Sequence, residues 1–266
     1  MHPILFELAG YRVASYGVAL VLAFAVGIAV ARRRADARGL DGERVVDAAL
    51  WIALAAFVGA RLLWLATHPE VFADGFAALN PLRGGPAAGL GLSMHGGVAL
   101  ALAAAAAFFA RHRLPFLPYA DAMAPSVLLG EAITRLGCFL NGCCHGLACS
   151  LPWGVRFPVD SPAAGALGDV AVHPTQLYAA LLALAGFAAV LRWERAGRAA
   201  GQVFAACLLL LAGTRIGLDW LRHHEPAAVL WPASGGGAWL TVHQVFCVGL
   251  IALACVVAAR TRRSAA

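Results

Sequence analysis

The stretch YGVALVLAFAVGIAVARRR, residues 16–34, sets an apolar run directly against three arginines. A run of this kind can cross a bilayer as a helix, since a transmembrane helix needs roughly 20 predominantly apolar residues. The arginines follow the run rather than precede it, which is not the charge order of a secretory signal peptide. The stretch therefore predicts a membrane-spanning helix.

The composition extends this interpretation to the whole chain. Of the 266 residues, 61% are hydrophobic and 13% are charged, and the mean hydropathy is +0.77, whereas a water-soluble domain carries about 25% charged residues. We predict an all-α polytopic membrane protein that forms one integral membrane domain over residues 1–266. Asp121, Pro125 and Glu131 interrupt the apolar pattern of its fourth helix. We expect a small periplasmic head segment at 139–172 and seven transmembrane helices at about 13–31, 46–66, 90–110, 119–138, 174–191, 201–221 and 240–259.

The basic residues predict how the helices cross the membrane. The sequence has no lysine, so arginine supplies all 20 basic residues. With seven spans, the arginine clusters fall on one side, which the positive-inside rule makes cytoplasmic. The N-terminus is then periplasmic and the C-terminus cytoplasmic, and the net charge of +6 needs no nucleic acid to explain it. The clusters follow the first, third, fifth and seventh spans, at 32–44, 111–113, 192–198 and 260–263.

The remaining arginines fall on the outer side of this topology or within the outer half of a span. A charged residue inside a membrane is costly, and it is by default a candidate for a functional site. Guanidinium groups suit bidentate contacts with phosphate. With Tyr16, His95 and His173, these arginines predict an outer-leaflet pocket that binds a phospholipid headgroup. They are Arg12, Arg61, Arg83, Arg135, Arg156, Arg215 and Arg222.

Internal ion pairs are an alternative explanation for some of these arginines. Arg215, Asp219 and Arg222 are spaced i, i+4, i+7 on one helical face, so the carboxylate can neutralise both arginines. Glu131 lies one turn before Arg135 in the same way. From the residues alone, a structural ion pair and lipid binding are equally good explanations of the first trio.

The histidines also have two explanations. His95 stands in GLSMHGG, where it is either a structural histidine, a general base or a hydrogen-bond donor to phosphate. His173 opens HPTQLY, and it can simply cap a helix beside Tyr178 at the membrane interface.

Six motifs in a fixed order resemble those of bacterial prolipoprotein diacylglyceryl transferases. They span nearly the whole chain: YGVAL (16–20), GAR (59–61), SMHGG (93–97), RLGCFLNG (135–142), HPTQLY (173–178) and R-x3-D-x2-R (215–222). The resemblance implies a multi-pass inner-membrane enzyme that needs no metal or organic cofactor. It further implies transfer of the diacylglyceryl group of phosphatidylglycerol to the lipobox cysteine thiol of a preprolipoprotein signal peptide, with release of glycerol phosphate, a step of lipoprotein maturation.

The resemblance also implies roles for individual residues. Arg135 and Arg215 match the family's two essential arginines and His95 its important histidine, so these are the expected catalytic residues. In the expected mechanism the arginines stabilise the leaving phosphate, and His95 assists deprotonation of the acceptor thiol. The expected substrate-binding residues, from the resemblance and the outer-leaflet argument together, are Tyr16, Arg61, Asn141, Gly146, Arg156, His173 and Arg222.

The chain departs from the family's usual G-R-x-G-N-F-x-N-G-E signature. Thr134 replaces the first glycine, Cys138 the asparagine and Cys143 the glutamate, and Ala179 stands where a glutamate is common. This cysteine-bearing form is similar to a divergent branch of the family.

The added cysteines lie close together in the sequence. Cys138, Cys143, Cys144 and Cys149 are on or beside the predicted outer face. Because an oxidising periplasm permits disulfides, we expect one or two structural bridges among these four. Free thiols, or a metal site that includes His145, are the alternatives.

Two functions from other classes fit the same features. A transporter or flippase could use the arginines to guide a lipid or another anion, although the chain shows no inverted repeat. A thiol or metal sensor could be built on the same scaffold.

Overall fold

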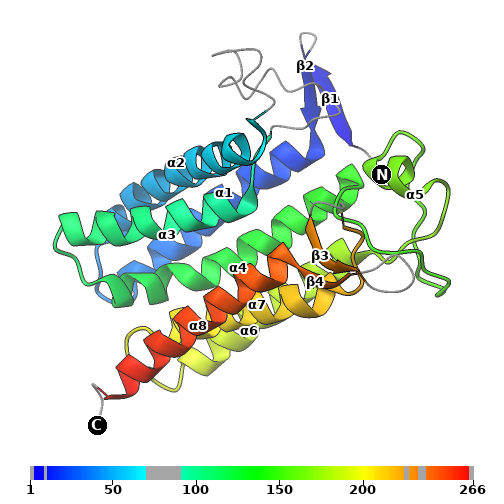
Figure 1. Ribbon diagram of the computed structural model, residues 1–266. Coiled ribbons are helices and arrows are strands. Elements are labelled where there is room, and N and C mark those ends of the chain that lie inside the picture. Colours follow the sequence, from blue (N-terminus) through cyan, green and yellow to red (C-terminus); the bar gives the residue numbers. More distant parts are fainter. Residues whose placement is uncertain (1–2, 9–10, 70–90, 225–227, 233–237, 264–266) are drawn as a thin grey trace. The chain divides into compact units, whose positions relative to one another are not determined.

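The chain forms long helices, with a β-hairpin before α1 and another before α8 (Figure 1). The computed structural model describes residues 3–8, 11–69, 91–224, 228–232 and 238–263. In chain order the elements are β1 (Ile4–Leu8), β2 (Tyr11–Ala14), α1 (Ser15–Asp36), α2 (Gly42–Thr67), α3 (Met94–Arg111), α4 (Phe116–Asn141), α5 (Pro162–Leu167), α6 (Thr175–Glu194), α7 (Gln202–Asp219), β3 (Val229–Pro232), β4 (Ala238–Thr241) and α8 (Val242–Arg263).

The structure confirms the predicted all-α polytopic class. Within the described ranges, seven helices are long and apolar enough to cross a membrane, and each corresponds to one predicted span. Their ends differ by a few residues; α1, for example, continues to Asp36 and carries the first arginine cluster in its last turns. The two hairpins were not predicted, because strands of four or five residues are too short to show a two-residue period.

The chain packs as two compact units, Leu40–Tyr119 and the combination of Met1–Gly39 with Ala120–Ala266. In the unit Leu40–Tyr119, α2 and α3 pack closely as an antiparallel pair. A Cβ at Gly59 would collide with the carbonyl of Gly96, and the reverse is also true. Small residues at a helix crossing let the two backbones approach, as is common between membrane helices. The prediction of a single membrane domain over the whole chain stays a prediction.

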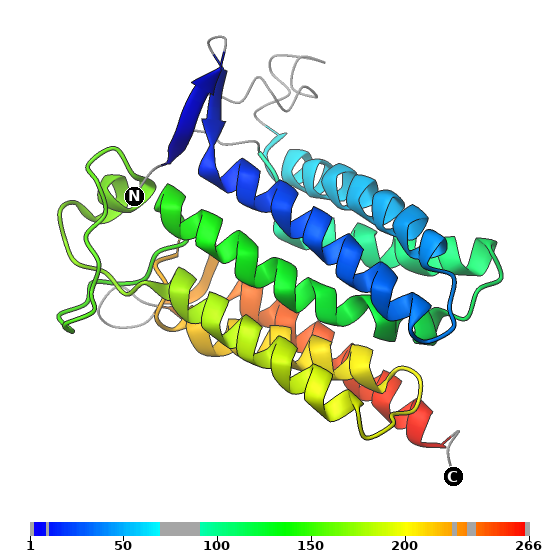
Figure 2. The ribbon, with the colours of Figure 1, turned by 180° about the vertical axis from the view of Figure 1, so that it is seen from behind.

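The other unit contains α1, α6, α7, α8 and most of α4. Figure 2 shows α1, α4 and α6 side by side from behind. Leu128 of α4, Val190 of α6 and Val203 of α7 are among the residues of one buried apolar cluster, which fixes these three helices against one another. α7 also packs on α8 through Leu208 and Ala254. The candidate site lies within this unit.

The residues that interrupt the apolar pattern of α4 have specific partners. The carboxylate of Asp121 accepts hydrogen bonds from the backbone N–H groups of Gly201 (2.6 Å) and Phe204 (2.7 Å), at the start of α7. Pro125 has no N–H, so it leaves the carbonyl of Asp121, four residues earlier, without a helical partner. Arg34 donates to that carbonyl through Nη2 at 3.1 Å. The polar positions of α4 therefore join it to α1 and α7.

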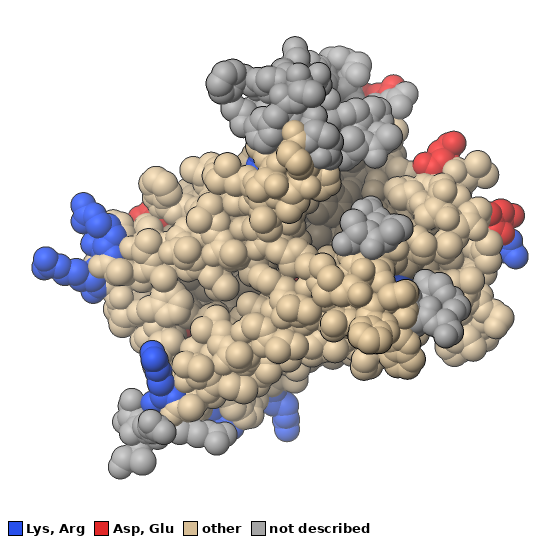
Figure 3. All heavy atoms as spheres, viewed as in Figure 1, with Lys and Arg blue, Asp and Glu red and all other residues tan. Residues whose placement is uncertain are grey.

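The outward faces of the helices are apolar, as expected for surfaces that contact lipid. Only 17 to 39% of each membrane-length window is buried within the protein, and large apolar side chains such as Trp51 and Leu181 are exposed. In Figure 3 the charged side chains gather toward the ends of helices, and the surfaces between them are uncharged. At one such end, Glu194 of α6 pairs with Arg34 at 2.8 Å and also with Arg38. A multi-pass membrane protein satisfies both observations, because apolar faces belong in the bilayer and charges at its borders.

Candidate active site

A pocket opens between α4, α6 and α7, near the C-terminal ends of α4 and α7 and the N-terminal end of α6. Its walls combine apolar side chains with several charged and polar ones, which is the usual make-up of a small-molecule site. The lining residues are Glu131, Arg135, Cys144, Thr175, Gln176, Ala179, Ala183, Leu211, Thr214, Arg215, Leu218 and Arg222.

Three of the predicted site arginines, Arg135, Arg215 and Arg222, line this one pocket. The Nε of Arg135 donates to Glu131 Oε1 at 2.7 Å, and the two residues are spaced i, i+4 on α4. The Nε of Arg215 lies 3.2 Å from Asp219 Oδ1 on α7. Each of these two arginines therefore has a carboxylate beside it.

Arg222 differs from Arg135 and Arg215, because the carboxylate of Asp219, one turn before it, already contacts Arg215 and Thr241. The second carboxylate oxygen of Asp219 accepts from the hydroxyl of Thr241 at 2.6 Å, and its side chain is fully buried. Within the described ranges Arg222 has no ion-pair partner, and its buried Nε has no hydrogen-bond partner. The structure thus divides the trio that the sequence left ambiguous: Asp219 neutralises Arg215, and Arg222 keeps its charge for the pocket.

Short backbone bridges bring the separated motifs together. The N–H of Gly146 donates to the carbonyl of His173, and the N–H of Leu147 donates to the carbonyl of Leu221, each at 2.9 Å. Gly146 and Arg222 face each other in an antiparallel bridge. A Cβ at Gly146 would lie 2.7 Å from both of those carbonyl oxygens, so only glycine fits there. The motifs at 135–146, 173–178 and 215–222 therefore meet in one place.

The start of α6 fixes the segment that follows α4. The hydroxyl of Thr175 donates to the carbonyl of Cys144 at 2.9 Å, and the amide of Gln176 donates to the carbonyl of Cys143 at 2.7 Å. Gly142 has a φ of +75°, and a Cβ there would come within 2.8 Å of Ser161. This turn reverses the chain at the end of α4 and places two successive cysteines beside the pocket.

Cys138, near the end of α4, forms a cluster with the two cysteines of this turn. The Sγ atoms of Cys138, Cys143 and Cys144 all lie within 4.8 Å of one another. Together with Cys149 they are free thiols in the structure, so the expected disulfides are not formed in it. Hydrogen bonds from Cys138 and Cys143 and the charges of Arg222 and Arg135 hold the pKa of Cys144 well below the ordinary thiol value. Cys144 is the member of the cluster that lines the pocket.

Two further predicted residues lie near this cluster. Tyr16, in the first turn of α1, is close enough for electrostatic interaction with the three thiols and with Arg135. The side chain of Asn141 forms a hydrogen bond with Cys143. Neither residue is part of the pocket lining, so both border the site through the cysteines.

Two of the predicted substrate-binding side chains point elsewhere. Arg156 is exposed on the head segment and pairs with Asp169 at 3.2 Å. The ring of His173 lies 3.4 Å from the hydroxyl of Tyr178, which also accepts from Trp153 at 2.8 Å. His173 serves the site through its backbone carbonyl, which the sequence could not indicate. Arg156 is a component of the head segment, and neither side chain lines the pocket.

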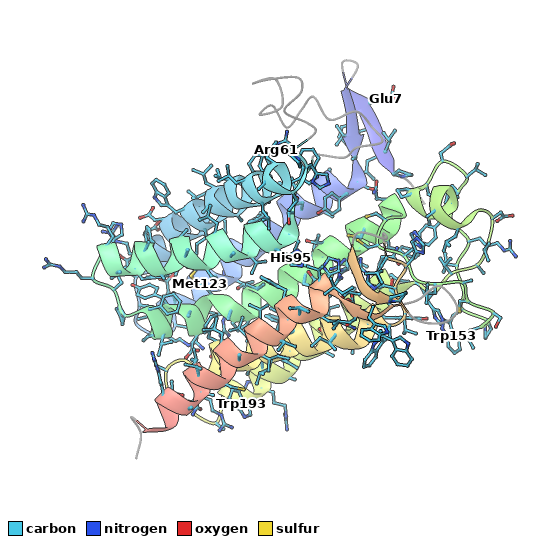
Figure 4. All side chains as sticks on the ribbon, viewed as in Figure 1. Glu7, Arg61, His95, Met123, Trp153 and Trp193 are labelled. Atoms are coloured by element: carbon cyan, nitrogen blue, oxygen red, sulfur yellow. The ribbon has the colours of Figure 1, made fainter. Side chains whose placement is uncertain are left out.

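Arg61 and His95 belong to the unit Leu40–Tyr119, where they lie at the same end of the α2–α3 pair (Figure 4). Arg61 donates to the carbonyl of Gly91 at 3.1 Å and stacks over Trp64. His95 is the second residue of α3 and is half-buried. Arg83 lies outside the described residues, as does the side chain of Arg12.

Sequence reasoning missed three polar residues of the pocket: Thr175, Gln176 and Thr214. Thr175 and Gln176 lie inside the HPTQLY motif, between His173 and Tyr178. Two polar residues that follow a proline at the start of a predicted membrane helix are the signal that could have identified them.

Comparison with known proteins identifies the family of this chain. The family model described as "Prolipoprotein diacylglyceryl transferase" matches residues 3–260. A phosphatidylglycerol–prolipoprotein diacylglyceryl transferase from Idiomarina loihiensis is 32% identical over 256 residues, which cover 94% of this chain and 91% of that protein. Proteins of the same name from Corynebacterium glutamicum and Clostridium tetani are 34% and 27% identical, over 78% and 84% of this chain and 68% and 86% of their own lengths. The chain belongs to the prolipoprotein diacylglyceryl transferase family.

Proposed function

We propose that this protein transfers the diacylglyceryl group of phosphatidylglycerol to the lipobox cysteine thiol of preprolipoproteins, forming a thioether. The family and the names of its relatives support this reaction. The observation that carries it is the pocket in which three arginines converge and only two have a carboxylate beside them. An excess positive charge in an apolar membrane pocket calls for an anionic ligand, and a phospholipid phosphate supplies one.

The chemistry follows from this charge arrangement. The sulfur of the acceptor cysteine attacks the glycerol carbon that bears the phosphate ester, and the C–S bond forms as the C–O bond breaks. The electron pair of that bond leaves with glycerol phosphate, and the thiol proton goes to a base. Negative charge therefore grows on the leaving phosphate, where Arg135, Arg215 and Arg222 stabilise it. Preorganised cations at the site of developing charge are a large source of rate enhancement.

His95 is the proposed base, since an unperturbed thiol is mostly protonated near neutral pH and imidazole titrates in that range. We expect His95→Gln to lower the transfer rate by about 100-fold or more, the usual contribution of general base catalysis. Binding of phosphatidylglycerol should be unchanged. A His95→Gln variant with nearly wild-type transfer would remove His95 from this role.

We also propose the orientation of the protein in the inner membrane, with a periplasmic N-terminus and a cytoplasmic C-terminus. The arginine clusters at the ends of α1, α3, α6 and α8 support it. The pocket, which lies at the opposite ends of α4, α6 and α7, then opens toward the outer leaflet, where phosphatidylglycerol and an exported signal peptide are both available.

The direct test combines purified protein with labelled phosphatidylglycerol and a lipobox peptide. We expect a thioether-linked diacylglyceryl peptide, detected by mass spectrometry, with wild-type protein and a cysteine peptide only. Arg135→Ala and a peptide with serine in place of cysteine should give no product. Arg198→Ala is the control, because Arg198 is exposed and stacks on Trp193, beyond the C-terminal end of α6. Lipid movement across proteoliposomes without covalent product would instead support the flippase alternative.

A further inference from the structure

The thiol cluster formed by Cys138, Cys143 and Cys144 has no role in the reaction as described so far. The three sulfur atoms come from the end of α4 and from the turn that follows it, and all lie within 4.8 Å of one another. Among the residues that the structure describes, this is the group of His, Cys, Asp and Glu side chains close enough to hold a metal ion. The resemblance implied no metal, so the cluster is a departure that belongs to this chain.

We propose that Cys138, Cys143 and Cys144 bind one zinc ion, and that the fourth position of this ion takes the acceptor cysteine of the client protein. The proposal rests on the proposed transferase function for its substrate, but not for the metal site. The structure supports it in four ways, which are the spacing of the sulfurs, the conformation of the turn, the neighbouring charges and the place of Cys144 in the pocket.

The spacing fits zinc after small side-chain rotations. With Zn–S bonds near 2.3 Å, two thiolates on a tetrahedral or trigonal ion lie about 3.8 to 4.0 Å apart. The observed upper limit of 4.8 Å is close to this range. Cys138 and Cys143 are separated by four residues, within the C-x2–4-C spacing of many zinc sites. A disulfide uses only two sulfurs, and it would leave the third thiol of the cluster unexplained.

The backbone of the turn is held in the conformation that gathers the thiols. Cys144 has a φ of +60°, which is uncommon for a residue other than glycine. Such strain persists only where surrounding contacts impose it, and it concentrates at functional sites. Here the contacts are the bonds from Thr175 and Gln176 to the carbonyls of Cys144 and Cys143. The start of α6 thus fixes the backbone of two of the three proposed ligands, Cys143 and Cys144.

The positive charges beside the cluster would stabilise the negatively charged complex of zinc with its thiolates. Zinc with three thiolates carries one net negative charge, and a fourth thiolate adds another. Arg135 and Arg222 act electrostatically on Cys144, and Arg135 acts on Cys138 as well. These guanidinium groups would offset the negative charge of the thiolates in a site that is partly buried. His145, by contrast, is not one of the grouped residues; its Nδ1 lies 3.1 Å from the carbonyl of Gly146 and its ring stacks on His223.

Three protein ligands and one open position are the pattern of catalytic zinc sites, whereas structural sites are closed by four. A thiol that binds the ion loses its proton, because coordination lowers the thiol pKa, and the proton passes to the proposed base, His95. The client sulfur would then be a thiolate beside the arginines that hold the phosphate, since Cys144 lines the same pocket. After transfer the sulfur is a neutral thioether, a weaker ligand, and the product can leave.

Metal binding is tested first, on the full chain in detergent after chelator treatment and thiol reduction. We expect one equivalent of zinc per chain by elemental analysis, and a thiolate-to-metal charge-transfer band when cobalt(II) replaces zinc. Cys143→Ser should lose both signals. Cys149→Ser and Cys255→Ser should keep them, because neither residue belongs to the cluster. Reduced protein that binds less than a stoichiometric amount, or peptide mapping that finds a disulfide within the cluster of freshly isolated protein, would overturn the proposal.

The open position is tested by adding a lipobox peptide to the cobalt protein. A cysteine peptide should change the visible bands, whereas the serine peptide should not. In the transfer assay, removing the metal should slow the reaction by up to about 30-fold near pH 7, since a thiol with a pKa of about 8.5 is only a few per cent ionised there. This loss should shrink about tenfold per pH unit on raising the pH toward that pKa.

The outcomes separate the two proposals. Full transfer by metal-free protein at every pH overturns the zinc proposal and leaves the transferase function in place. Stoichiometric zinc with cobalt bands that respond to the cysteine peptide, but without any lipidated product, supports the zinc site and overturns the transferase function.

Discussion

Arg215 and Arg222 are identical residues seven positions apart, yet their surroundings give them different tasks. Arg215 lies against the fully buried carboxylate of Asp219, which is also held by Thr241. A buried pair of this kind contributes to the fold, because removal of one partner strands the other charge. Arg222 lacks such a partner within the described ranges and points its charge to the pocket. In the reaction that we propose, Arg215 therefore combines a structural role with a catalytic one, and Arg222 is left to bind the phosphate.

This difference predicts the effects of two matched substitutions. Arg222→Ala should lower kcat/KM for phosphatidylglycerol by about 10- to 150-fold, the equivalent of a charge-assisted hydrogen bond worth about 1.5 to 3 kcal/mol. The unfolding temperature in detergent should stay within a degree or two of the wild type, because no described ion pair is lost. The measurements are steady-state kinetics and thermal unfolding of the same preparations.

Arg215→Ala is the comparison. It should lower both the activity and the unfolding temperature, since Asp219 would become a buried charge without its cation. If Arg222→Ala unfolded at a lower temperature than Arg215→Ala, the division of tasks between the two arginines would be wrong.

At the scale of elements, the site depends on the junction between the head segment and the helix ends. Gly146 and Leu147 bond to the segment before α6 and to the segment after α7. Thr175 and Gln176 at the start of α6 return bonds to the turn after α4. Three membrane helices are thus joined at one end by a few hydrogen bonds to backbone carbonyls. This arrangement explains why the motifs at 135–146, 173–178 and 215–222 lie toward helix ends.

A glycine-to-alanine pair tests the junction. Gly146→Ala should lower stability by about 1 to 3 kcal/mol, because its Cβ would press on the carbonyl oxygens of His173 and Leu221. Gly213→Ala in α7 is the control; a Cβ there meets no atom within 4 Å, and alanine favours a helix over glycine. The measurements are the thermal unfolding of both variants and the transfer activity of each variant that remains folded. Equal stability of the two variants would show that the junction tolerates displacement.

At the scale of the whole molecule, the membrane sets the requirements. The seven long helices satisfy their own backbone groups, and their exposed apolar side chains face lipid. Within the unit that contains the pocket, arginines are concentrated at the C-terminal ends of α1 and α6, and the pocket lies at the N-terminal end of α6. In the orientation that we propose, this charge distribution sets which leaflet the pocket faces, and with it which lipids and which protein segments can reach the site.

Orientation can be measured with a protease-cleavable tag. A tag inserted after Val159, which is 85% exposed on the head segment, should be cleaved in intact spheroplasts. A tag at the C-terminus should be protected until the membrane is broken. The reverse pattern would place the pocket at the cytoplasmic leaflet, where it could not serve exported lipoproteins.

The sequence alone determined the class and the number of spans, because hydrophobic runs of bilayer length and the arginine clusters are properties of the chain itself. It also selected seven arginines, Arg135, Arg215 and Arg222 among them, since a charge on the outer side of this topology or inside an apolar span stands out without a structure. Asp121 and Pro125, which only looked like interruptions, were explained by contacts with α7 and α1.

The tertiary structure decided which polar groups are partners. Whether Asp219 neutralises one arginine or two, and whether four cysteines pair or three of them cluster, depends on distances between side chains that sequence spacing does not fix. The physical reason is that a helix fixes neighbours one turn apart, while contacts between helices and turns arise only when the chain packs. The carbonyl of His173, the amide of Gln176 and the three gathered sulfurs beside the pocket all belong to this second kind.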